Sequence, residues 1–201
     1  MSSQLDSSPY SLPPAVQRVA SAFRIAGWVS FWGQLVLSII SAVVLLFAGS
    51  TLTLANSAPA TAGGVQTSSA ETGIGLLLSV CGLVALLVGA FWAFRYTRMA
   101  RRLKTAEAQV RPKRSDVFQL LRLGLLVNLA GMAFTILGAQ AIVGALVAKS
   151  FAQGFSLLSG NPLKFVNPLD VFLVQASTNI TMAHFIGLIG TLWLLRCVNR
   201  Q

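Results

Sequence analysis

Two long runs without a charged residue, 73–94 and 123–148, limit what this chain can fold into. Each run exceeds the about 20 residues that an α-helix needs to cross the hydrocarbon layer of a bilayer. Similar apolar runs cover about 25–49 and 169–195. The sequence therefore predicts an all-α fold, an integral membrane bundle of four transmembrane helices that forms one domain over residues 13–201.

The composition agrees with a membrane protein. Only 10% of the residues are charged, whereas a soluble domain has about 25%, so too few polar side chains remain to cover a soluble globule. A formal net charge of +10 would elsewhere suggest a nucleic-acid partner. Here the basic residues flank the apolar runs, which membrane topology and anionic lipid headgroups explain better. We therefore expect membrane lipids, and no nucleic acid, as partners.

A basic segment, residues 95–122, separates the second and third apolar runs. The positive-inside rule places such a loop in the cytoplasm, and four spans then place both termini there. Of the 15 Lys and Arg residues, only Lys149 and Lys164 fall outside the segments assigned to this side. The residues expected to set topology and meet lipid headgroups are Arg98, Arg101, Arg102, Lys104, Arg111, Lys113 and Arg114.

The N-terminal region divides into two parts. Residues 1–12 are polar and rich in serine, which predicts a disordered tail. In residues 15–24, Val16, Val19 and Phe23 fall on one side of a helix, which predicts a short interfacial helix on the cytoplasmic surface. A plain extension of the first span is an equally good interpretation.

Small and polar residues recur at spacings of three and four in each span, which is typical of one helix face. One interpretation is a packing seam, because small residues let helix backbones approach closely in lipid. The other is that the seams enclose a polar path. The glycines expected to pack are Gly82, Gly89, Gly124, Gly131, Gly138 and Gly187.

A candidate polar cluster, for a path or for interhelical bonds, comprises Gln34, Ser38, Asn128, Thr135 and His184. His184 lies twelve residues before Arg196, which is about 18 Å at helical rise and therefore near mid-membrane. An ionisable residue at that depth is a candidate functional residue; an ordinary interhelical hydrogen bond is the alternative. His184, Met182, Met132 and Cys81 are candidate ligands for a soft metal, although their spacing is not diagnostic.

The sequence lacks the usual signatures of catalysis. It contains no phosphate-binding loop, paired carboxylates or Ser/His/Asp constellation, and no Asp or Glu lies deep within a span. We expect that the protein is not an enzyme and holds no resident cofactor.

Five segments carry a resemblance to a known family: residues 18–24, 30–37, 94–103, 121–128 and 139–144. In order and spacing they resemble the cyanobacterial and chloroplast family of the inner-envelope permease-in-chloroplasts protein. That family has also been assigned to the inner-envelope protein-import translocon. The likeness extends from about Pro13 to Arg196.

The resemblance implies a membrane protein of the cyanobacterial plasma or thylakoid membrane, or of the chloroplast inner envelope. The first twelve residues lack a long transit extension, which favours the cyanobacterial branch. The main expectation is a multi-pass permease or translocon protein for metal-ion transport, with iron as the transported ion. The alternatives are a translocon or assembly component and a structural subunit of a larger complex. Each implies a homo-oligomer or other membrane proteins as partners.

Overall fold

The computed structural model describes residues 14–57, 70–105, 112–158 and 168–200. They form four helices: α1 (Pro14–Ser57), α2 (Ala70–Leu103), α3 (Arg114–Leu158) and α4 (Pro168–Asn199). Each contains a stretch long and apolar enough to cross a membrane: Val16–Ser50, Gly73–Leu103, Arg114–Ala148 and Asp170–Asn199. The predicted all-α bundle of four such helices is confirmed.

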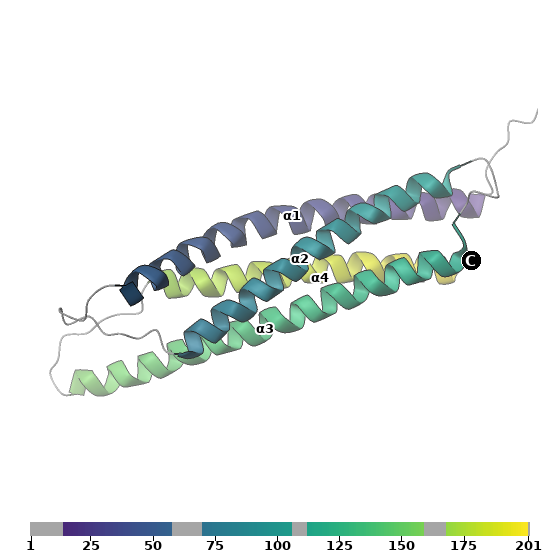
Figure 1. Ribbon diagram of the computed structural model, residues 1–201. Coiled ribbons are helices and arrows are strands. Elements are labelled where there is room, and N and C mark those ends of the chain that lie inside the picture. Colours follow the sequence, from purple (N-terminus) through teal and green to yellow (C-terminus); the bar gives the residue numbers. More distant parts are fainter. Residues whose placement is uncertain (1–13, 58–69, 106–111, 159–167, 201) are drawn as a thin grey trace, which may run out of the picture.

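The helices alternate in direction along a single bundle (Figure 1). α1 and α3 start, and α2 and α4 end, at the same end of the molecule, which we call the basic end because Arg98, Arg101, Arg102 and Arg114 lie there. Both ends of the described chain are therefore on one side, as the predicted topology requires. Which side of a membrane this is stays a prediction.

The four helices are not equivalent in their contacts. α2 and α4 each pack against both α1 and α3, and they also touch one another across the middle. α1 and α3 lie at opposite corners and make only slight contact. In Figure 1, α2 crosses in front of α4, between α1 and α3.

The observed connection between α2 and α3 is shorter than the predicted basic loop. α2 continues to Leu103 and α3 begins at Arg114, so the prediction of a loop over 95–122 was wrong in its extent. Arginine and lysine are good helix formers, and a helix that leaves the membrane can continue through them. At the start of α3, Asp116 Oδ2 accepts a hydrogen bond from the backbone N–H of Lys113 at 3.3 Å, which caps the first turn. Arg111 lies outside the described residues.

The structure has no separate interfacial helix within residues 14–57. Residues 14–24 are the first turns of α1, which was the alternative interpretation of the sequence. Val19 and Phe23 are buried in an apolar cluster with Tyr96, Leu121 and Leu194. The apolar side of this segment therefore faces the other helices, because α2, α3 and α4 also supply residues to this cluster. The predicted disordered tail, residues 1–12, lies outside the described residues.

The interior has two apolar clusters with a polar layer between them. One cluster, around Phe23 and Leu121, occupies the basic end. The other, around Leu45 and Ile142, occupies the opposite half. Between them lie Gln34, Asn128 and His184, and this layer contains the candidate site.

Candidate functional site

The centre of the bundle is a hydrogen-bonded set of three side chains from three helices. Gln34 of α1, Asn128 of α3 and His184 of α4 are 0%, 3% and 0% exposed. Gln34 Nε2 donates to Asn128 Oδ1 at 2.7 Å. Asn128 Nδ2 donates to the carbonyl oxygen of Gly124, one turn earlier, at 2.8 Å. These two bonds fix which way the Asn128 amide points.

Two glycines make room for the bond between Gln34 and Asn128. A Cβ added at Gly89 of α2 would lie 3.0 Å from Asn128 Oδ1 and 3.4 Å from Gln34 Nε2. A Cβ added at Gly187 of α4 would collide with the same two amides. The amide pair therefore crosses the bundle between α2 and α4, at a level where neither helix has a side chain to block it.

The His184 ring lies between two oxygen acceptors. Its Nδ1 is 3.3 Å from Asn128 Oδ1, and its Nε2 is 3.1 Å from the carbonyl oxygen of Gly82. A neutral imidazole carries one N–H and can donate to only one of them. Gln34 Oε1 is buried and has no hydrogen-bond partner among the described residues. One of the two His184 contacts therefore lacks a proton to share, and Gln34 Oε1 is a second unsatisfied acceptor at the polar centre.

Small residues on α2 and α3 leave room for the His184 ring and pack closely around it. A Cβ added at Gly131 would collide with the His184 imidazole and would lie 2.8 Å from the Ala85 Cβ. Thr135 packs directly over Gly82, and its hydroxyl donates to the Gly131 carbonyl at 2.8 Å. The polar centre is therefore enclosed by close backbone contacts.

The predicted packing glycines all lie against a neighbouring helix. At each of them an added Cβ would come within 3.4 Å of an atom of another helix. Gly124 faces the Tyr96 hydroxyl, and Gly138 faces the Gly75 carbonyl and Ser79. The full set is Gly82, Gly89, Gly124, Gly131, Gly138 and Gly187.

The structure divides the predicted polar cluster. It brings Gln34, Asn128 and His184 together and places Thr135 beside Gly82, next to the ring. Ser38 is also buried, but its hydroxyl donates to the Leu35 carbonyl of its own helix at 2.8 Å instead of to the central amides.

Two further interhelical pairs were absent from the predicted cluster. Tyr96 and Thr191 hydroxyls lie 3.3 Å apart between α2 and α4, and Ser79 and Ser177 hydroxyls lie 3.2 Å apart. The signal was in the sequence, because Ser177 and Thr191 flank His184 at seven-residue intervals, which keeps all three on one helix face.

The candidate metal ligands do not converge. Cys81 is exposed, and Met182 is 53% exposed on the outside of α4. Met182 precedes His184 by two residues, which turns it to the opposite side of the helix. Met132 is half-buried. No group of three or more His, Cys, Asp or Glu side chains forms a metal site among the described residues.

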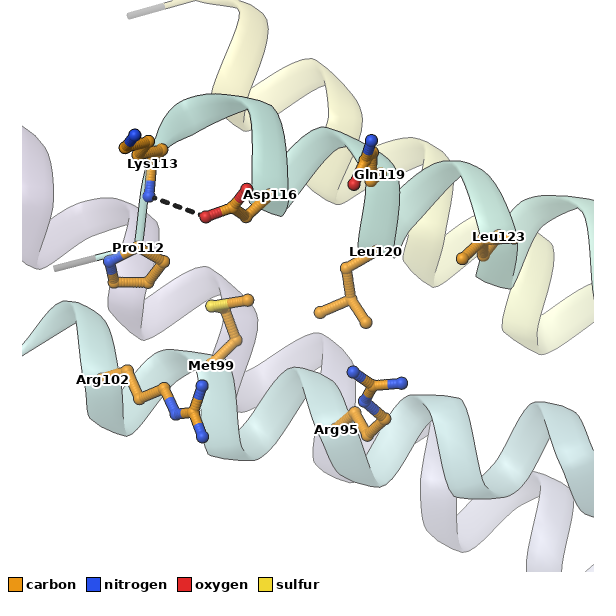
Figure 2. A pocket seen from close by; sticks show the side chains of 9 residues that line it. All are labelled: Arg95, Met99, Arg102, Pro112, Lys113, Asp116, Gln119, Leu120 and Leu123. Atoms are coloured by element: carbon orange, nitrogen blue, oxygen red, sulfur yellow. Dashed lines mark hydrogen bonds between the residues drawn. The ribbon is translucent and has the colours of Figure 1, made fainter.

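The basic end has a cleft of about 570 Å³ between α2 and the start of α3. Its lining includes Arg95 and Arg102 from α2, with Met99 between them, and Leu120 from α3 (Figure 2). The predicted headgroup residues Arg98, Arg101, Arg102, Lys104, Lys113 and Arg114 are exposed. Of these, Arg102 and Lys113 line the cleft.

Comparison with known proteins identifies the family to which the chain belongs. The model of a family described as "Protein of unknown function (DUF3611)" matches residues 13–199. The chain belongs to this family. The DUF3611 chain is also similar to "Protein TIC 21, chloroplastic" from Arabidopsis thaliana, with 36% identity over 188 residues. The alignment covers 91% of this chain and 58% of that relative, so the chain spans little more than half of the relative's length.

These matches confirm the resemblance drawn from the five sequence segments. No solved structure matches the DUF3611 chain. Together with the four long apolar helices, the matches identify an integral membrane protein.

Proposed function

We propose that this DUF3611 protein is a non-catalytic component of a translocon-type membrane protein complex. The observation that carries the proposal is that the small residues of the four spans pack against neighbouring helices. Gly82, Gly131 and Gly187 lie against side chains of neighbouring helices, and the Gln34–Asn128 bond crosses the middle. A packed interior suits a bundle that acts through its outer surface.

The outer surface supports the same role. Large apolar side chains point outward along all four helices, including Val43, Leu87, Leu137 and Ile189. In a membrane these positions contact lipid or the helices of other membrane proteins. The relative's name places that protein in the chloroplast. By extension, the DUF3611 protein belongs in a plastid envelope or a cyanobacterial membrane, with the basic end on the cytoplasmic or stromal side.

The test is to identify stable neighbours in the native membrane. A photo-crosslinking residue at Leu137, which is 58% exposed, should give defined adducts with another multi-pass protein. The same residue at Leu121, which is fully buried, is the matched control and should give none. The intact complex, solubilised in mild detergent, should contain that neighbour in a fixed stoichiometry. A homo-oligomer without other subunits would contradict a translocon component.

Iron permeation is the second candidate function. The favouring observation is at the polar centre, where Gln34 Oε1 is buried without a partner among the described residues and His184 lies between two oxygens. A cation passing through would meet one imidazole and neutral amide oxygens, which is a weaker ligand set for a hard cation than carboxylates.

A flux measurement separates the two functions. Purified protein would be reconstituted into sealed vesicles that contain an Fe²⁺-sensitive dye. Ferrous flux above that of empty vesicles, lost in His184→Gln, would establish permeation and overturn a purely structural role. Flux equal to that of empty vesicles would leave the translocon component as the function.

A further inference from the structure

We propose that the cleft between α2 and the start of α3 binds the headgroup of an anionic phospholipid. This inference is independent of the proposed function, because it concerns a separate site at the basic end. The cleft has a volume of about 570 Å³ and is lined on the α2 side by Arg95, Met99 and Arg102. Figure 2 shows the two arginines on one side of α2, with Met99 between them and Leu120 across the cleft.

The two guanidinium groups suit a phosphate. Arg95 and Arg102 are seven residues apart, so they lie on the same face of α2 about 10 Å apart along its axis. The Arg95 guanidinium lies 5.0 Å from the centre of the Trp92 ring. Stacking of this kind orients an arginine and leaves N–H groups at its edge free to donate. Arginine N–H groups form strong charge-assisted hydrogen bonds to phosphate oxygens.

The charge balance of the cleft favours an anion. Lys113 adds a third cation to its lining. Asp116 is the one acid among the described residues that line the cleft, and its Oδ2 accepts the backbone N–H of Lys113. The cleft is therefore net positive, and its carboxylate is engaged in starting α3.

The apolar surroundings favour a lipid over a soluble phosphate. Met99, Leu120 and Leu123 line the cleft beside the arginines. Farther from the basic end, α2 and α3 expose apolar side chains, among them Phe91 at 56% and Leu126 at 59%. A phospholipid can place its headgroup between the arginines and its acyl chains along this apolar surface, whereas a free phosphate ion would use only the charged part.

Lipid titration with matched variants tests the site. The full-length protein, purified in mild detergent, would be titrated with phosphatidylglycerol and with phosphatidylcholine of the same acyl chains, and native mass spectrometry would count bound lipid. The double variant Arg95→Gln/Arg102→Gln removes the two cleft guanidiniums. The control, Arg18→Gln/Arg24→Gln, removes equal charge from exposed positions of α1 that do not line the cleft.

The wild type should prefer phosphatidylglycerol. The cleft variant should bind it at least about tenfold more weakly, which is the effect of losing a hydrogen bond to a charged group, while phosphatidylcholine binding is unchanged. The control should retain the wild-type preference. Equal loss in both double variants, or no preference in the wild type, would overturn the cleft as a site.

Two further measurements separate lipid binding from a folding defect and from binding of a soluble phosphate. Phosphatidylglycerol should raise the melting temperature of the wild type and not of the cleft variant, because a ligand stabilises only the state that binds it. If the glutamine variant does not fold, Arg95→Lys/Arg102→Lys keeps the charge and should retain a weakened preference for phosphatidylglycerol; unweakened binding would overturn the proposal. Displacement of the lipid by inorganic phosphate or glycerol 3-phosphate would overturn a lipid ligand in favour of a soluble phosphate.

Discussion

Gln34 of α1 and Asn128 of α3 share a 2.7 Å hydrogen bond, although their helices lie at opposite corners of the bundle and barely touch. The bond passes between Gly89 of α2 and Gly187 of α4. His184 of α4 then contacts the same Asn128 oxygen and the Gly82 carbonyl of α2. One small polar centre therefore links all four helices.

Replacing Asn128 tests the importance of this centre. Asn128→Leu removes the acceptor of Gln34 Nε2 and leaves a buried donor unpaired, which costs about 1–3 kcal/mol. The melting temperature in detergent should fall accordingly. Gln140→Leu makes a similar amide-to-leucine change at an exposed position of the same helix and should have little effect. Equal melting of the two variants would show that the polar centre adds no stability.

Enlarging the glycines of the α2–α3 contact should separate those helices. Gly131→Leu would push into the His184 ring and Ala85, and Gly82→Leu would push into Thr135. Overpacking of this kind costs about 1–3 kcal/mol or more. Thermal melting and gel filtration would detect the loss. Leu126→Ile, at a site 59% exposed, is the control; unchanged melting of both glycine variants would contradict the observed packing.

A compensating pair tests the contact between Tyr96 and Gly124. A Cβ added at Gly124 would collide with the Tyr96 hydroxyl, so Gly124→Ala should lower stability. Tyr96→Phe alone removes the 3.3 Å contact with Thr191 and should cost about 0.5–1.5 kcal/mol. In the double variant the hydroxyl is absent, so the cost of the alanine should shrink. Additive effects in a double-mutant cycle would argue against this contact.

The topology prediction can be tested with cysteine labelling in sealed cells. In a Cys81→Ser/Cys197→Ser background, Lys104→Cys at the basic end should not react with a membrane-impermeant thiol reagent added outside, because the positive-inside rule keeps this end in the cytoplasm. Ser150→Cys, exposed on α3 near the opposite end, should react. The reverse pattern of labelling would invert the assigned orientation.

Some of the candidate site could be read from the sequence. The three- and four-residue spacing placed Gln34, Asn128, Thr135 and His184 on interior faces, and all four are buried. The same periodicity could not separate Ser38 from them, although its hydroxyl bonds to its own helix. The sequence also predicted Cys81 and Met182 as neighbours of His184. Their depth in the membrane is similar, but depth along a helix axis does not indicate which side of the helix a side chain occupies.

The amino-acid sequence alone was enough to predict the fold class, the four apolar helices and the location of both ends of the described chain with the basic residues. These features follow from the length of uncharged runs and from the order of charges along the chain, which are local properties. The three-dimensional arrangement was needed to show that α1 continues from Pro14 as one helix, that α2 and α4 approach across the middle, and that Gln34 reaches Asn128 between two glycines. These features depend on the rotation and axial shift of each helix relative to its neighbours. Close backbone contacts at glycines fix that arrangement, and the sequence of any one helix does not specify it.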